Sequence, residues 1–165
     1  MDNVQKKLVS GIFELWNMAQ IDEEKFYNQD IPDIGFVSAK KYVLIRLPKG
    51  CPYPFKADRK NENIRQRMRE LITDSKAERV FDTGETKIVG KNIKTKKFIY
   101  GTEGQEILVS EFLYEYLPLS AKSIDVYDDR VLRVYIEGEE LPVVIVSIIK
   151  NPGVMSNDEH IKKSN

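Results

Sequence analysis

The residues of this chain that could do chemistry are mostly basic, and they gather in its middle. Residues 56–97 hold thirteen Lys and Arg against seven Asp and Glu, although the whole chain has 26 of each and no net charge. Clustered basic side chains bind nucleic acids largely because they release counterions condensed on the phosphates, and exposed aromatic rings can stack on bases. The sequence therefore predicts an anion-binding surface that combines Tyr53, Phe55, Arg65, Arg69, Lys94, Lys96 and Lys97.

The arginines of this surface lie on a helix expected at 61–73. Arg65 and Arg69 are one turn apart and share a face, whereas Arg67 points roughly to the opposite side. A competing interpretation is that the basic segment lies beside residues 98–141, which hold ten Asp and Glu against three Lys and Arg. Apposed segments would neutralise each other and leave neither one free for a partner.

The lysines of the surface are expected at the tip of a β-hairpin. Strand-like residues at 87–93 and 98–100 flank a corner at 94–96, and the basic tip of the hairpin comprises Lys91, Lys94, Lys96 and Lys97. Two strand-like runs joined by a short connection are typical of a hairpin. Reversing the charge of this tip is expected to weaken binding to an anionic partner without unfolding the domain.

The loop at 48–55 contains three prolines and a glycine, which exclude regular structure. Such a loop can expose Tyr53 and Phe55 for stacking. It also contains Cys51, the only cysteine of the chain, but a nucleophilic cysteine needs a base nearby. The only histidine, His160, belongs to the polar C-terminal residues. We interpret Cys51 as a loop residue without a catalytic role.

Acidic residues offer the alternative function, a metal-dependent enzyme that acts on phosphodiesters or nucleotides. Its ligands would be Asp125, Asp128, Asp129 and Glu137. Two of these stand in an expected turn, where aspartate is favoured by hydrogen bonds to its own backbone. The acidic segment could also act as a surface that occupies the nucleic-acid groove of another protein, because its potential is complementary to such a groove.

Other catalytic chemistries lack their residues. One cysteine and one histidine are too few for an ordinary zinc site, and no glycine-rich phosphate loop with its Lys-Ser or Lys-Thr pair is present. The sequence predicts no cofactor and favours binding over catalysis.

The chain has no sign of a membrane or secreted location. No apolar run approaches the ~18 residues of a membrane span, and the N-terminus lacks the unbroken apolar stretch of a signal peptide. The single cysteine cannot form an intramolecular disulfide. We expect a cytoplasmic protein; its oligomeric state does not follow from the sequence.

Three helices are expected, at 3–21, 61–73 and 102–117, because apolar residues recur there at three- and four-residue steps. Thr102 followed by Gln105 has the form of a capping box for the third. The expected strands are 35–37, 42–47, 79–81, 87–93, 98–100, 123–127, 131–137 and 142–150.

The predicted fold is a single α+β domain over residues 1–151. It combines an antiparallel sheet of about five to six strands with three helices, and its last three strands form a C-terminal meander. The run at 143–149 is apolar on both faces, as expected of a central strand covered on both sides. Residues 152–165 are predicted to be a polar, flexible tail.

These patterns favour a small non-enzymatic binding or regulatory protein. Its partner would be a nucleic acid or a nucleic-acid-handling protein complex, as for an inhibitor carried by a phage or another mobile element.

Overall fold

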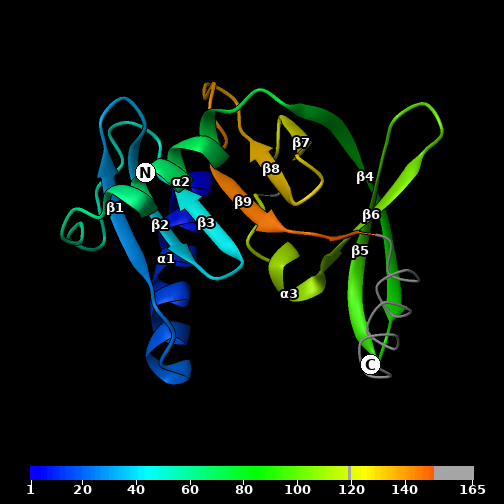
Figure 1. Cartoon of the computed structure of the whole chain (residues 1–165), viewed down its shortest axis with the longest axis horizontal. Coiled ribbons are helices and arrows are strands. Elements are labelled where there is room, and N and C mark those ends of the chain that lie inside the picture. Colours follow the sequence, from blue (N-terminus) through cyan, green and yellow to red (C-terminus); the bar gives the residue numbers. More distant parts are fainter. Residues whose placement is uncertain (119, 151–165) are drawn as a thin grey trace.

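The computed structural model describes residues 1–118 and 120–150. In this part of the chain, three helices accompany one antiparallel sheet of ten strands (Figure 1). The helices are α1 (Asn3–Asp22), α2 (Glu62–Thr73) and α3 (Glu111–Tyr114). The strands are β1 (Tyr27–Ile31), β2 (Gly35–Lys40), β3 (Val43–Arg46), β4 (Ala77–Val89), β5 (Ile93–Tyr100), β6 (Gln105–Ser110), β7 (Ser123–Tyr127), β8 (Val131–Tyr135), β9 (Val144–Ser147) and β10 (Ile149–Lys150). None of the described helices is long and apolar enough to span a bilayer.

The α+β class agrees with the sequence-based prediction, but the predicted sheet of five to six strands is wrong. Ten strands form the sheet, and the tenth contains only two residues. One unexpected strand is β1, whose central residues are all polar. Another is β6, which occupies part of the helix predicted at 102–117. The tail predicted at 152–165 lies outside the described residues.

Strand β6 replaces helix because its apolar residues are consecutive. Ile107, Leu108 and Val109 are each at most 1% exposed, so both faces of the segment are buried. A helix would bury only one side of such a run, whereas a strand covered on both faces buries every side chain. β6 pairs with β5 on one side and with β10 on the other. Only the four residues of α3 remain helical.

Strands β4 to β10 form a closed ring, which has six members because β9 and β10 belong to one continuous stretch of chain. Strands β7, β8 and β9 pair in sequence as the predicted meander, and β7 also pairs with β4. The series then continues through β5 and β6 to β10. Because only Ile148 separates β9 from β10, one stretch, 144–150, pairs with β8 at its start and with β6 at its end.

The ring encloses the larger hydrophobic core. Each of its strands contributes side chains that are almost fully buried, and α3 adds Leu113. The strand residues of this core are Val80, Phe98, Tyr100, Ile107, Val109, Val126, Leu132, Val134, Val144 and Val146.

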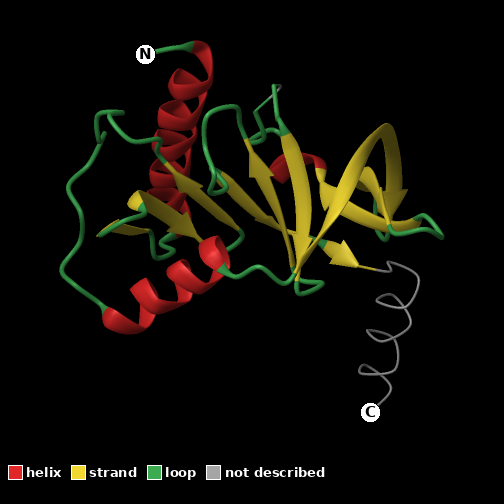
Figure 2. Cartoon of the chain, turned by 90° about the horizontal axis from the view of Figure 1, so that it is seen from above, coloured by secondary structure: helices red, strands yellow, loops and turns green. Residues whose placement is uncertain are grey.

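Strands β3, β2 and β1 extend the sheet outward from β9, and helices cover both faces of this extension (Figure 2). Helix α1 packs Leu8 and Ile12 into the larger core, and its first turn is capped by Asp2. Gly11 allows the close approach, since a Cβ there would lie 2.9 Å from the Cδ1 atom of Ile45.

Helix α2 covers the opposite face and forms a second core. Met68 and Ile72 pack there with Leu44 of β3 and Ile145 of β9. Val144 on the same strand belongs to the larger core. Strand β9 is therefore central and covered on both sides, which confirms the prediction made from its apolar run.

Candidate functional site

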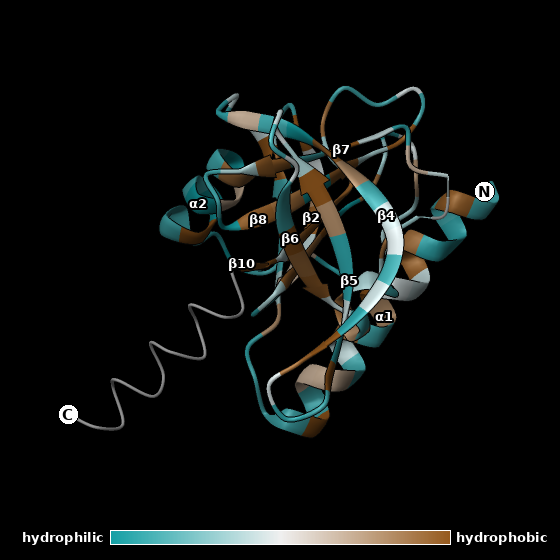
Figure 3. Ribbon diagram, turned by 90° about the vertical axis from the view of Figure 1, so that its right-hand side faces the viewer, coloured by the Kyte–Doolittle hydropathy of each residue, from teal (hydrophilic) through white to brown (hydrophobic). Residues whose placement is uncertain are grey.

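The predicted basic hairpin is present, but its turn is three residues earlier than expected. Strand β4 has an irregularity between Asp82 and Thr86 and then pairs with β5 from Thr86 to Val89. Gly90 and Asn92 have positive φ angles of 54° and 63° and form the turn, a conformation that favours glycine and asparagine. We call residues 86–96 the β4–β5 arm. It lies at the right of Figure 1, and most of the outer length of β4 is hydrophilic to neutral (Figure 3).

The two faces of the arm differ because side chains alternate along each strand. Lys94 pairs with Ile88, and Lys96 pairs with Thr86, so these residues share one face. Lys97, the third lysine of the predicted tip, is on the other face of β5. The three predicted lysines therefore do not form a single patch.

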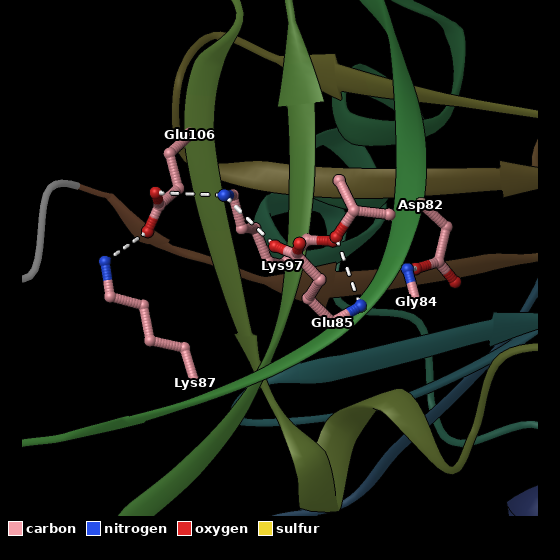
Figure 4. Close-up of polar contacts among 7 residues, drawn as sticks. Asp82, Gly84, Glu85, Lys87, Lys97 and Glu106 are labelled. Atoms are coloured by element: carbon pink, nitrogen blue, oxygen red, sulfur yellow. Dashed lines mark hydrogen bonds and ion pairs between the residues drawn. The ribbon is translucent and has the colours of Figure 1, made fainter.

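Carboxylates neutralise the face that carries Lys97. Its Nζ atom lies 3.2 Å from Glu85 and 3.7 Å from Glu106, and Lys87 is 2.7 Å from Glu106 (Figure 4). These contacts shift the pKa values in opposite directions. The hydrogen bond from Lys87 lowers the pKa of Glu106, and the hydrogen bond to Glu85 raises the pKa of Lys97.

The other face keeps its positive charge. Lys94 and Lys96 form no ion pair with any described residue, and neither does Lys91 in the turn. Lys96 donates to Thr86 Oγ1 at 3.0 Å and lies 5.5 Å from the centre of the Tyr114 ring. Beside these lysines the side chain of Ile88 is 61% exposed. We call Ile88, Lys91, Lys94 and Lys96 the basic face of the arm.

The acidic segment therefore neutralises the basic segment on only one face of the arm. Glu106 belongs to the acidic segment 98–141 and neutralises two lysines of the basic segment on one face of the arm. No described carboxylate forms an ion pair with the lysines of the basic face.

Arg65 and Arg69 share a face of α2, as predicted from their spacing, but they point at the edge of the sheet. Arg65 donates to the carbonyl of Asp30 at 3.1 Å, and Arg69 donates to the carbonyl of Pro32 at 3.4 Å. Strand β1 is an edge strand, whose outward carbonyls need such donors. α2 and the β4–β5 arm are far apart (Figures 1 and 2), so the arginines and lysines do not meet on one surface.

The two predicted stacking residues are also separated. Phe55 packs among the rings of α1, 4.9 Å from Phe13 and 5.3 Å from Trp16. Tyr53 instead stacks on Phe36 at 4.4 Å. Phe55 is therefore occupied in packing, whereas Tyr53 remains half-exposed.

Tyr53 lines a cavity of about 690 Å³. The buried cation of this cavity, Arg46, already donates to Glu139 at 2.7 Å and to the carbonyls of Leu141 and Pro142. Carboxylates line the cavity as well, among them Asp30 and Glu139. This combination disfavours an anionic ligand.

Asp125, the first predicted metal ligand, is bound to an arginine. Its two oxygens accept from Arg133 at 2.8 and 3.1 Å, and one of them also accepts from Tyr135 at 2.7 Å. Bidentate pairing of this kind uses the lone pairs that a metal would need.

The other three predicted acids have different surroundings. Asp128 pairs with Arg130 at 2.8 Å, Asp129 lies 3.4 Å from the Tyr100 hydroxyl, and Glu137 is exposed. Among the described residues, no group of three or more His, Cys, Asp or Glu side chains is placed to hold a metal ion.

One member of the basic face, Ile88, was missed by the sequence reasoning, and the position of the turn was wrong. The signal was present, because Gly90 and Asn92 are typical turn residues. Placing the turn at 90–92 would have set the alternation of side chains along both strands correctly.

Comparison with protein-family models, with curated proteins and with solved structures finds no match to this chain. Its function has to be inferred from the chemistry of its own residues.

Proposed function

We propose that this chain is a small cytoplasmic, non-enzymatic binding protein that engages a nucleic acid through the basic face of the β4–β5 arm. The observation that carries the proposal is the one-sided charge of the arm. Lys91, Lys94 and Lys96 form no ion pair with described residues, whereas Lys87 and Lys97 on the other face are neutralised. A surface that lacks internal counterions is suited to an anionic partner.

The shape of the arm supports a duplex partner. A two-stranded β-ribbon fits into the major groove of DNA, and lysines along its face can reach the phosphates on either side. The exposed Ile88 adds an apolar contact of the kind that nucleic-acid-binding ribbons make with bases. A nucleic-acid-handling protein would offer an acidic surface to the same lysines, and the experiment below separates these two partners.

The test is fluorescence anisotropy with labelled single- and double-stranded DNA and RNA at low and near-physiological salt. Wild-type protein is expected to bind duplexes in a salt-sensitive manner. The triple variant Lys91→Glu/Lys94→Glu/Lys96→Glu should bind far more weakly, and removing three phosphate contacts should reduce the slope of log K against log salt by about 3.

The matched control is Lys56→Glu/Arg59→Glu/Lys60→Glu, which makes the same change in net charge in an exposed loop of the same basic segment. It should bind nearly as well as wild type. Equal loss in both variants would indicate a general charge effect and contradict the assignment to the arm. Absence of binding by the wild-type protein at low salt would remove nucleic acid as the partner.

A further inference from the structure

A groove between α2 and the sheet has the features of a second binding site, distinct from the β4–β5 arm. Its volume is about 540 Å³, within the range of pockets that hold small molecules. One wall is α2, and the opposite rim consists of the β2–β3 turn with Lys41 and the β7–β8 turn with Arg130. Leu44 and Ile145 of adjacent strands lie between these walls.

Arg67 enters this groove because of its position on the helix. Ile64, Arg67, Met68 and Leu71 are spaced as i, i+3, i+4 and i+7, so they lie along one side of α2, and all four line the groove. Arg65 and Arg69, in contrast, are bound to the edge of β1. Arg67 is therefore the arginine of α2 that can contact a ligand in the groove.

All the charged residues that line the groove are basic. Its lining includes Lys40, Lys41, Arg67 and Arg130 but no aspartate or glutamate. Lys40 is compensated from outside the lining, at 3.1 Å from Asp22 and 3.3 Å from Glu24. Arg130 pairs with Asp128 at 2.8 Å, and both side chains are about half exposed, so a ligand anion can compete for this arginine. Lys41 and Arg67 form no ion pair with any described residue.

The groove also offers an apolar and aromatic surface. Ile64 and Leu71 are only partly buried, and the Tyr42 ring at the rim is 51% exposed. Lys41 lies 5.1 Å from the centre of that ring, so an aromatic face and a cation are adjacent. A ligand that complements this surface needs a flat or apolar body next to its negative charge.

We infer that the groove binds a nucleoside phosphate. Cations that come from three separate elements are better matched by the several oxygens of a phosphate chain than by one carboxylate. The base would lie against Tyr42 and the apolar wall of α2, while Lys41, Arg67 and Arg130 contact the phosphates. This site does not depend on the β4–β5 arm, so either assignment can fail without the other.

Isothermal titration calorimetry with ADP on the full chain tests the inference. ADP is expected to bind with a Kd below about 1 mM. Adenosine, which lacks the phosphates, and pyrophosphate, which lacks the base, should each bind at least about tenfold more weakly. The double variant Lys41→Glu/Arg67→Glu should lose at least about tenfold in affinity for ADP while keeping the wild-type circular dichroism spectrum and Tm.

Two controls isolate the groove. Arg59→Glu/Lys60→Glu makes the same charge change at exposed positions outside the groove and should leave the Kd for ADP unchanged, as should the triple variant of the β4–β5 arm. The inference is overturned if ADP does not bind below about 1 mM, or if the loop variant weakens binding as much as the groove variant. Dodecanoate serves as an anion with an apolar chain but no base. If pyrophosphate or dodecanoate bound as tightly as ADP, the inference would also be overturned, since either result means that the base is not recognised.

Discussion

Replacing Arg133 by methionine is expected to lower the free energy of unfolding by about 4 kcal/mol. The Arg133 side chain is 3% exposed and joins three elements of the fold. Its Nε and Nη2 atoms donate to both carboxylate oxygens of Asp125. Its Nη1 atom donates to the carbonyls of Leu71 at 3.1 Å and Asp74 at 2.7 Å, where α2 ends. Arg133 therefore attaches the end of α2 to the closed ring.

The magnitude follows from the groups that would lose their partner. Removing one member of a buried ion pair costs about 3–5 kcal/mol, and each carbonyl that loses a buried donor adds about 1 kcal/mol. Methionine offsets part of this cost, because it keeps an unbranched apolar stem between the rings of Tyr127 and Tyr135, which lie 5.1 and 6.0 Å from the guanidinium carbon. The Asp125 side chain is 17% exposed, so water also relieves some of the cost.

Urea denaturation followed by circular dichroism measures this loss, which corresponds to a decrease in Tm of about 8–16 °C. The double variant Arg133→Met/Asp125→Leu should be more stable than the single Arg133→Met variant, since no unpaired charge remains. A loss below about 1 kcal/mol in the single variant would refute the reasoning. A double variant that loses the sum of the two single losses would show that the pair is not coupled.

Two further predictions concern the neighbourhood of the arm. The hydrogen bond to Asp82, at 2.6 Å, raises the pKa of Tyr114 from 10.0 to about 12. The stability from this raised pKa is complete below pH 10 and is lost as the pH rises toward 12; a spectrophotometric titration should show Tyr114 ionising late in wild type and earlier in Asp82→Asn. Glu106→Gln should leave nucleic-acid binding in the anisotropy assay nearly unchanged, because Lys87 and Lys97, which lose a counterion, lie on the face of the arm opposite to the basic face; a change as large as that of the triple variant would contradict the assignment of binding to the basic face.

The first two helices could be predicted from sequence because local signals agreed with the fold. The apolar stripe of α1 is preceded by Asp2, which forms a capping box with Gln5, and α2 begins after Asn61, whose side chain accepts from the N–H of Ile64. In both helices the periodic residues face a sheet. Local preference and tertiary packing therefore gave the same answer.

Strands β1 and β6 could not be predicted because long-range contacts decide them. β1 buries polar side chains, and Asn28 accepts a hydrogen bond from Ser38 of the neighbouring strand. Nothing in the local pattern indicates that partner. In β6 the residues that satisfy a helical spacing also satisfy a buried strand, and pairing with β5 and β10 selects the strand.

The candidate sites show the same division. The spacing of Arg65, Arg67 and Arg69 correctly separated Arg67 from the other two. Arg65 and Arg69 face the edge of β1, so only Arg67 remains for a ligand. The sequence did not predict β1, and it therefore could not show which side of α2 would face a ligand. The lysines of the arm were recognised by type, but the turn lies three residues earlier than predicted, and Lys97 lies on the face of β5 opposite to Lys94 and Lys96.

The stretch 144–150, which closes the ring, also determines when β3 can pair during synthesis on the ribosome. β3 emerges early, yet its partner β9 follows only after residue 143. At ordinary translation speeds of about 5–20 residues per second, the edge of β3 waits about 5–20 s for its partner. An apolar strand edge is prone to aggregation while it is unpaired. The nascent chain therefore has a defined interval in which a chaperone would protect it, and that interval ends when β9 joins β3 to β8.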